Sequence, residues 1–177
     1  MITISKPQPN DAEGINEVIK LSWYATYVTP EIGITKEDID LMYAQSEKKQ
    51  IEVFRHRAEH PKDDDISFVA KENDVVVGFI RLVFLDDHVR VRTFYVHPDH
   101  IRKGIGTSLW NEALKHLPKD KPVIAWPTQH TKSIDFYKKI GFVPTGEIKT
   151  DEEAMLSSGT HMEVIKMVFK GAIPTVL

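Results

Sequence analysis

The chain has 177 residues, 41% of them hydrophobic and 28% charged, with a formal net charge of −3 at pH 7. This size and composition are typical of one globular domain, and the slight acidic surplus argues against a nucleic-acid or membrane-surface partner, because phosphate binding needs clustered Lys and Arg. The absence of cysteine excludes disulfides, thiolate nucleophiles and Cys-ligated zinc. Without a secretory pattern at the start or a long apolar run, we expect a cytoplasmic protein.

The first part of the chain favours one strand followed by two helices. Ile2–Ser5 has the pattern of a short strand, and an amphipathic helix is predicted to follow, with Asn10 or Asp11 as its cap. A second helix is predicted to begin at the cap Thr35, because Asp38 stands three residues later as in a capping box.

The remainder of the chain favours strands interrupted by two shorter helices. Runs of β-branched and aromatic residues predict strands at Ile66–Ala70, Val75–Leu85 and Val89–Val96, joined by two tight turns. Later elements are a helix over about 104–117, a strand over 123–126, a helix over 131–140, and strands over 142–148 and 162–169. This order, β-α-α-β-β-β-α-β-α-β-β, predicts a mixed α/β layered domain.

A basic, glycine-containing turn between a strand and a helix carries the strongest chemical signal. Arg102 and Lys103 precede Gly104-x-Gly106, which opens an amphipathic helix. The first amides of a helix have no intrahelical partner and lie at the positive end of its dipole, so they bind phosphate well. The predicted diphosphate cradle consists of Arg102, Lys103, Gly104, Ile105, Gly106, Thr107 and Ser108.

Two other interpretations of this turn were considered. The glycines could simply permit a tight turn with close packing, without any ligand. A Rossmann-type dinucleotide site is the second alternative, but it needs G-x-G-x-x-G after the first strand of the fold. Here the motif follows the fourth predicted strand and the third glycine position is Leu109, which excludes the Rossmann interpretation.

Two segments of the sequence resemble one known family. Val96-x-Pro98, the basic residues and Gly104-x-Gly106 are similar to motif A of the GNAT (Gcn5-related N-acetyltransferase) family, and Ser133–Phe142 resembles its motif B. The resemblance extends over about 66–170 and implies a GNAT-like acyl-CoA N-acyltransferase fold, with a mostly antiparallel mixed sheet flanked by helices. It describes 1–177 as a single N-acetyltransferase domain, with motif A at about 91–110, motif B at about 131–143 and substrate-side helices at about 10–58.

The resemblance also implies a donor and a set of site residues. Acetyl-CoA would be the acetyl donor, no metal would be needed, and the backbone of Phe94, Tyr95 and Val96 would hold the pantetheine arm. Tyr137 matches the tyrosine that protonates the departing thiolate; the alternative is that it is a core aromatic. Tyr27 and Trp126 are candidates for the acceptor pocket.

The chain departs from the family pattern at several positions. Ile101 stands where the family usually has Arg or Gln. Either the geometry of the loop differs, or Arg102 does the same work from a shifted backbone. Lys132 stands where the family often has Asn. The fourth strand carries Arg90 and Arg92 where many relatives have a catalytic glutamate. The general base is therefore unassigned, with the candidates Glu31, Asp86, Asp87, His88 and His130.

Three functions are compatible with these features. The leading one is acetyl transfer to a primary amine of a small molecule, by direct attack on the thioester. The alternatives are a protein or peptide N-acetyltransferase and a catalytically silent acyl-CoA-binding module. The apolar tail Ala172–Leu177 suggests a homodimer. The histidine pairs His56/His60 and His97/His100 have no third ligand at a recognisable spacing, so no metal site is predicted.

Overall fold

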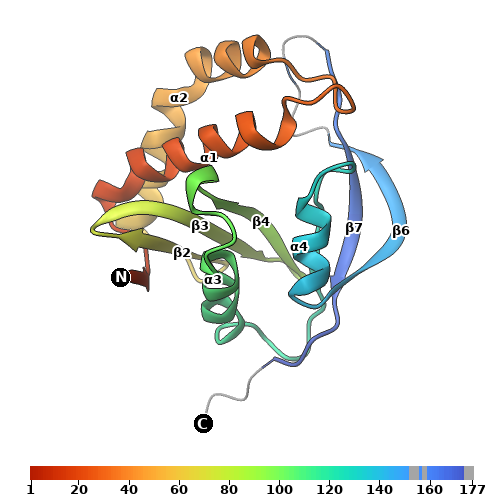
Figure 1. Cartoon of the computed structure of the whole chain (residues 1–177). Helices are drawn as coiled ribbons and strands as arrows, with labels where there is room; N and C mark the ends of the chain where they lie inside the picture. Colours follow the sequence, from red (N-terminus) through yellow and green to blue (C-terminus); the bar gives the residue numbers. More distant parts are fainter. Residues whose placement is uncertain (152–155, 157–158, 174–177) are drawn as a thin grey trace.

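The computed structural model describes residues 1–151, 156 and 159–173 (Figure 1). Its strands form a seven-stranded sheet in the order β1-β2-β3-β4-β5-β7-β6. In chain order the elements are β1 (Ile2–Ser5), a 3₁₀ turn (Pro9–Asp11), α1 (Ala12–Tyr27), α2 (Lys36–Glu59), β2 (Asp65–Glu72), β3 (Val75–Phe84), β4 (Val89–Val96), a 3₁₀ turn (Pro98–His100), α3 (Ile105–Leu114), β5 (Val123–Ala125), α4 (Ser133–Lys139), β6 (Phe142–Thr150) and β7 (Glu163–Phe169). The predicted element order and fold class are confirmed.

Helices cover both faces of the sheet (Figure 1). On one face, Ile15 and Val18 of α1 form a buried cluster with Val69 and Phe79 of the sheet. On the other face α3 packs through the fully buried Trp110 and its apolar neighbours. These contacts follow from the sequence pattern, since apolar residues on one side of each helix meet alternate residues of the strands.

The middle of the sheet contains a separation between two strands. All pairs of neighbouring strands are antiparallel except β4 and β5, which run parallel and pair only from Val89–Val91 to Val123–Ala125. Because β4 continues to Val96, its second half has no partner strand on the β5 side among the residues that the structure describes. α4 lies over this second half, between β4 and β7 (Figure 1).

The two helix starts in the first part of the chain differ in their capping. Thr35 forms the predicted capping box with Asp38, whereas Asp11 does not cap α1 with its side chain. The Asp11 carboxylate instead accepts the Gln8 N–H at 2.8 Å and pairs with Lys71 at 2.6 Å. Asp11 is thus the N-cap residue of α1, as one of the two predicted candidates, but its carboxylate bonds Gln8 and Lys71 instead of the first amides of the helix.

Replacing Thr35 with Ala is expected to lower the free energy of unfolding by about 1 kcal/mol. The Thr35 hydroxyl accepts the Asp38 N–H at 3.1 Å, and the Asp38 carboxylate accepts the Thr35 N–H at 2.9 Å. Alanine removes the first of these bonds, whereas Thr35→Ser keeps the oxygen and serves as the control. Urea denaturation of both variants measures the difference, and equal midpoints would argue against a contribution from the cap.

One prediction concerns a segment that lies only partly inside the described residues. The apolar tail suggested as a dimer contact includes 174–177, which lie outside the described residues. Within the described part of the chain, no helix has the length and apolar character needed to cross a bilayer.

Candidate functional site

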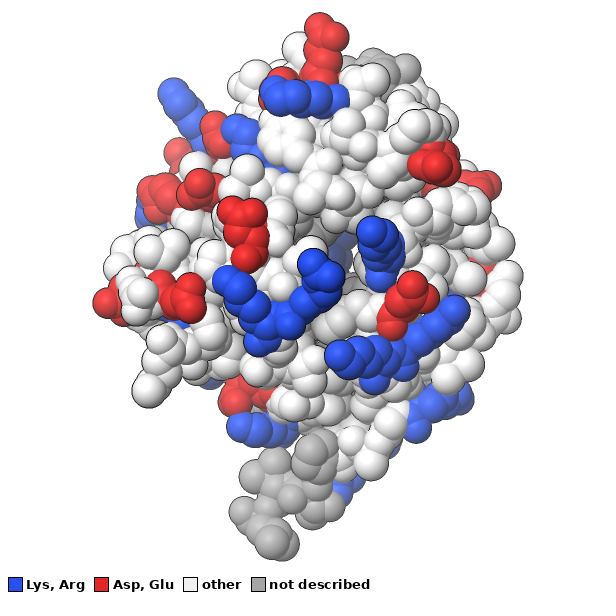
Figure 2. Space-filling model, viewed as in Figure 1, with Lys and Arg blue, Asp and Glu red and all other residues white. Residues whose placement is uncertain are grey.

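A large cleft of about 2000 Å³ lies beside the separated half of β4. Residues from α1, α2, β3, β4, the following loop, the segment after β5, α4 and the end of β6 line it. Figure 2 shows Lys and Arg side chains around a hollow at the centre of the face that carries α3 and α4. Among the basic residues that line the cleft on this side are Arg102, Lys132 and Lys139.

The backbone of β4 presents to this cleft groups that do not pair with β3. The His97 N–H donates to the Val77 carbonyl at 2.9 Å, which sets the hydrogen-bond alternation between β3 and β4. In an antiparallel pair, alternate residues turn their N–H and C=O groups to opposite sides. Tyr95 therefore bonds toward β3, whereas Phe94 and Val96 direct their backbone groups into the separation. The Ser22 hydroxyl already occupies the Val96 carbonyl at 3.1 Å.

Because of this alternation, the three residues expected to hold the pantetheine arm do not all turn their backbone groups toward the cleft. Phe94 and Val96 have backbone groups on the correct side to bond an added extended ligand. The expectation for the Tyr95 backbone is wrong, because its N–H and C=O face β3. The Tyr95 side chain nevertheless lines the cleft. Sequence pattern alone could not set this phase, which depends on the pairing register.

The start of α3 has the geometry of an anion site. Gly104 is the N-cap with a φ of 80°, and Arg102 also has a left-handed φ of 62°. The amides of the first helical turn, from Ile105 to Thr107, have no partner within the helix. The Ser108 N–H is different, because it donates to the Gly104 carbonyl at 2.9 Å. The expected contribution of the Ser108 amide to the cradle is therefore wrong.

The cleft includes most but not all of the predicted cradle. Arg102, Gly104, Ile105, Gly106 and Thr107 line it, whereas Lys103 and Ser108 are exposed residues outside its lining. Of the two positions that depart from the family pattern, Ile101 is 53% exposed and Lys132 is an exposed residue at the start of α4. Both of these side chains line the cleft.

Gly106 is in close contact with an aromatic ring of α4. A Cβ atom at Gly106 would lie 2.9 Å from Cζ of Phe136, which is closer than such atoms approach. The Phe136 ring also packs edge-on to Phe94, with centroids 5.2 Å apart. Close packing against Phe136 thus explains the glycine at position 106, which agrees with the interpretation that the glycines of this turn permit close packing. Gly104, by contrast, has open space around it. Phe136 of motif B therefore packs directly against Gly106 and Phe94 of motif A.

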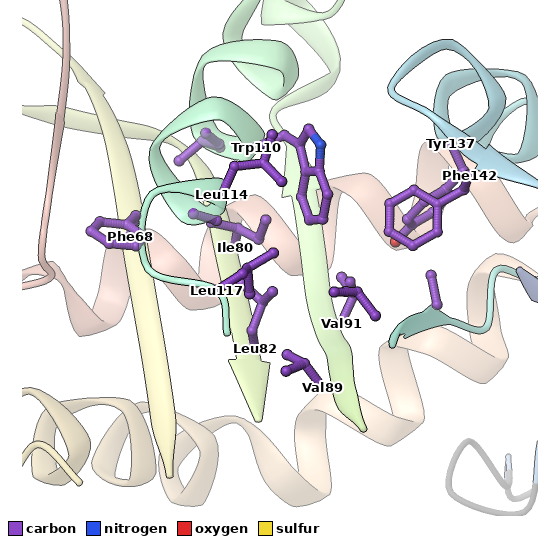
Figure 3. Close-up of a cluster of buried hydrophobic side chains, with 14 of the residues drawn as sticks. Phe68, Ile80, Leu82, Val89, Val91, Trp110, Leu114, Leu117, Tyr137 and Phe142 are labelled. Carbon is purple, nitrogen blue, oxygen red and sulfur yellow. The ribbon is translucent and has the colours of Figure 1, made fainter. Parts of the chain in front are cut away.

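Tyr137 projects from α4 into an aromatic cluster beside β4. Its side chain is 9% exposed and its ring packs edge-on against Phe142 at 5.2 Å and Phe94 at 6.2 Å (Figure 3). Tyr137 also lines the cleft. Burial raises the pKa of its hydroxyl above the ordinary value, so the phenol keeps its proton at neutral pH. Tyr137 is therefore a buried neutral hydroxyl at the cleft wall.

Two further tyrosines lie near Tyr137. The hydroxyls of Tyr27 and Tyr95 are 3.1 Å apart, within hydrogen-bond distance. Burial raises the pKa of both Tyr27 and Tyr95. Tyr27 lines the cleft from the end of α1, as expected for a residue of the acceptor pocket.

Trp126 is the second residue expected in the acceptor pocket. It follows β5 and lines the cleft, as predicted. Two lysine side chains lie over its ring, with the Lys149 ammonium 4.2 Å and the Lys166 ammonium 5.7 Å from the centroid. The tryptophan ring is therefore covered by cations from β6 and β7.

The structure separates the candidate general bases into two groups. Glu31 and His130 line the cleft, whereas the turn residues Asp86, Asp87 and His88 do not. The cleft also contains Asp151, at the end of β6, whose negative charge acts on Tyr27. Sequence reasoning missed Asp151 because it lies outside both motifs, after the strand that follows motif B, and the pairing of β6 with β7 brings it to the cleft.

One cluster away from the cleft differs from the sequence expectation. His56, Glu59 and His60 lie at the exposed end of α2, with ligand atoms all within 4.8 Å of one another. Glu59 supplies the third group that the histidine spacing alone did not indicate. The three residues share one helix face because their spacing is three and four residues.

Comparison with known proteins agrees with this geometry. Residues 33–142 match the acetyltransferase (GNAT) family. The chain belongs to the GNAT family. It is therefore an acyltransferase enzyme of the N-acetyltransferase kind, and the resemblance to this family is confirmed.

Similar GNAT proteins include a curated relative and two solved structures. Spermidine N(1)-acetyltransferase from Thermoplasma acidophilum is 27% identical over 146 residues, 80% of this chain and 88% of that protein. The crystal structure of PaiA N-acetyltransferase from the same organism, in complex with coenzyme A, superposes with a TM-score of 0.72 at 23% identity, covering 97% of this chain and 99% of that one. The ribosomal-protein-S18-alanine N-acetyltransferase of Escherichia coli gives 0.63 at 16% identity, covering 100% and 99%.

Proposed function

We propose that this GNAT enzyme transfers the acetyl group of acetyl-CoA to a primary amine of a small molecule. The observation that carries the proposal is the separation of β4 from β5, next to the α3 N-terminus and with Tyr137 on its wall. A slender acyl donor fits this arrangement, because the strand offers amide bonds and the helix offers an anion site. The acceptor class is supported by the similar spermidine N(1)-acetyltransferase.

The donor would lie along β4 with its diphosphate at α3. The Phe94 and Val96 backbone would bond the pantetheine, and the amides of Ile105, Gly106 and Thr107 would surround the diphosphate. Arg102 supplies a positive charge at the same loop. The PaiA structure that superposes on this chain is itself a complex with coenzyme A, which supports this choice of donor. The absence of a metal requirement stays a prediction.

The transfer then needs one nucleophile and two proton movements. The neutral amine attacks the thioester carbonyl carbon, a C–N bond forms and the C–S bond breaks. Tyr137 donates its proton to the departing thiolate of coenzyme A. The proton released from the amine nitrogen passes to a base, for which the cleft offers Glu31, His130 and Asp151. Tyr27 and Trp126 would contact the acceptor.

Acetyl-CoA should raise the melting temperature and NAD should not. A ligand that binds only the folded state stabilises it by about 2.7 kcal/mol at a concentration a hundredfold above its Kd. For a chain of this length each kcal/mol corresponds to roughly 2–4 °C. Thermal denaturation with each ligand at matched concentration measures the effect, and an equal shift with NAD would favour a dinucleotide site instead.

The activity itself is tested by coenzyme A release with a panel of acceptors. Small primary amines should accelerate release over the rate in buffer, and the acetylated product should appear by mass spectrometry. Faster release with N-terminal peptides than with every small amine would favour the peptide alternative. Binding of acetyl-CoA without release in any case would favour a silent acyl-CoA-binding module. The cytoplasmic location and the homodimer stay predictions.

A further inference from the structure

Three side chains that can bind a metal ion gather at the end of α2. The ligand atoms of His56, Glu59 and His60 all lie within 4.8 Å of one another, and we call these residues the His-Glu-His cluster. Its two imidazole rings lie beside each other, with centroids 4.6 Å apart and an angle of 49° between their planes. None of the three residues lines the cleft, so the proposed acetyl transfer does not use them.

The cluster lies on the solvent side of a helix whose inner side is anchored. Phe54 of α2 packs edge-on against Phe79 of β3, with ring centroids 5.6 Å apart. Because an α-helix has 3.6 residues per turn, positions 56, 59 and 60 point away from Phe54. All three are exposed. The His60 N–H donates to the His56 carbonyl at 2.9 Å, so the backbone holds both histidines on one helical turn.

The electrostatic surroundings of the His-Glu-His cluster favour a cation. The two arginines beside it in the sequence pair with other elements: Arg55 with Glu13 of α1, and Arg57 with Asp65 of β2 at 4.0 Å. The cluster also lies at the C-terminus of α2, where the last carbonyl groups have no helical partner and give the helix end a partial negative charge. The Glu59 carboxylate adds a full negative charge at the same place.

We propose that the His-Glu-His cluster binds a divalent transition-metal ion of the Zn²⁺, Ni²⁺ or Cu²⁺ kind. Imidazole nitrogens suit these ions, one carboxylate oxygen completes a three-ligand set, and water fills the open positions. Bonds of about 2.0–2.2 Å hold two ligand atoms of one ion no more than about 4 Å apart. Small rotations of three exposed side chains therefore close the site from its present span of 4.8 Å. Mg²⁺ and Ca²⁺ fit poorly, because they prefer oxygen ligands.

A bound ion would stabilise the end of α2 and the connection that follows it. It would link His56 to His60, the C-cap residue, across the last turn of the helix. The unfolded chain does not hold the three ligands together, so the ion binds the folded state and shifts unfolding by mass action. At a Zn²⁺ concentration a hundredfold above the Kd, we expect the melting temperature to rise by about 5–10 °C for a chain of this length.

Calorimetric titration of the full chain, prepared without a histidine tag, tests the binding. ZnCl₂ should bind saturably at one ion per chain, and MgCl₂ should give no saturable heat under the same conditions. With Cu²⁺ in place of Zn²⁺, the electron paramagnetic resonance spectrum should show coupling to imidazole nitrogen. If none of the three transition-metal ions binds saturably, or if Mg²⁺ binds as tightly as Zn²⁺, the inference is wrong.

Single substitutions assign the ion to the His-Glu-His cluster. His56→Gln and Glu59→Gln each remove one ligand from an exposed helix face, and each should weaken Zn²⁺ binding at least about tenfold and reduce the rise in melting temperature. His116→Gln is the matched control, because His116 is exposed and lies 3.6 Å from a single glutamate, Glu112. It should bind Zn²⁺ as the unaltered protein does. Undiminished affinity in His56→Gln or in Glu59→Gln would overturn the three-ligand site.

Discussion

Tyr137→Phe is expected to lower kcat by roughly 10²- to 10⁴-fold, the contribution of a positioned general acid. The substitution removes one oxygen and keeps the ring, so the edge-on contacts with Phe94 and Phe142 persist. The melting temperature and the affinity for acetyl-CoA should therefore change little. Burial raises the pKa of Tyr137, so its titration should not reduce the rate below a pH of about 10, the ordinary value of a phenol.

Melting temperature and kcat measured on the same variant decide between catalysis and packing. A core tyrosine that merely loses a hydrogen bond costs about 1 kcal/mol of stability and leaves kcat nearly unchanged. Tyr24→Phe is the control, because the Tyr24 hydroxyl bonds Asp40 outside the cleft lining. If Tyr137→Phe melted lower yet turned over at the rate of the unaltered enzyme, Tyr137 would have no part in the reaction.

Gly106→Val is expected to impair both stability and donor binding. Its Cβ would meet the Phe136 ring at 2.9 Å, so either α3 or α4 must shift. Overpacking of this kind costs about 1–3 kcal/mol. The shift would also move the first amides of α3, and we expect the affinity for acetyl-CoA to fall at least about tenfold, which is 1.4 kcal/mol. Calorimetry and thermal denaturation measure the two effects.

A second substitution separates the collision from the binding defect. Phe136→Ala removes the ring, so the double variant should regain melting temperature relative to Gly106→Val, as contacting residues are coupled. Gly104→Ala is the comparison at the neighbouring glycine, where a Cβ has open space but a φ of 80° is strained for alanine. Undiminished affinity for acetyl-CoA in Gly106→Val would place the diphosphate elsewhere.

Much of the fold was predictable because local patterns agreed with the final contacts. The capping box at Thr35, the strands at both hairpins and the glycine turn before α3 formed as expected. Motif spacing also brought Tyr137 to the cleft that contains the β4 backbone. For the cap and the turns, the determining interactions lie within a few residues of one another, where periodicity and turn chemistry are informative. The placement of Tyr137 followed from the resemblance of its motif and not from local interactions.

Features that depend on long-range pairing were not predictable. The register of β4 on β3 decides that Phe94 and Val96, but not Tyr95, face the separation. Within the first turn of α3, the Ser108 N–H donates a hydrogen bond to the Gly104 carbonyl. The contact of Gly106 with Phe136 joins positions thirty residues apart in the sequence, and the ion pairs of Asp65 with Arg57 and Arg81 join β2 to α2 and β3. No local pattern carries information about such contacts.

The separation of β4 from β5 also bears on aggregation. The second half of β4 is a strand edge in the interior of a sheet, with the Phe94 and Val96 amides available to any extended chain. Proteins usually protect an edge with lysine, proline or a bulge. Here the register shift at Arg92 precedes the aromatic and β-branched residues of the separated stretch. Its protection comes from its position at the bottom of a cleft, between α1 and α4 (Figure 1). The position of this edge inside the cleft therefore hinders its pairing with a strand of another molecule, while the same backbone groups stay open to a small ligand that lies in the cleft.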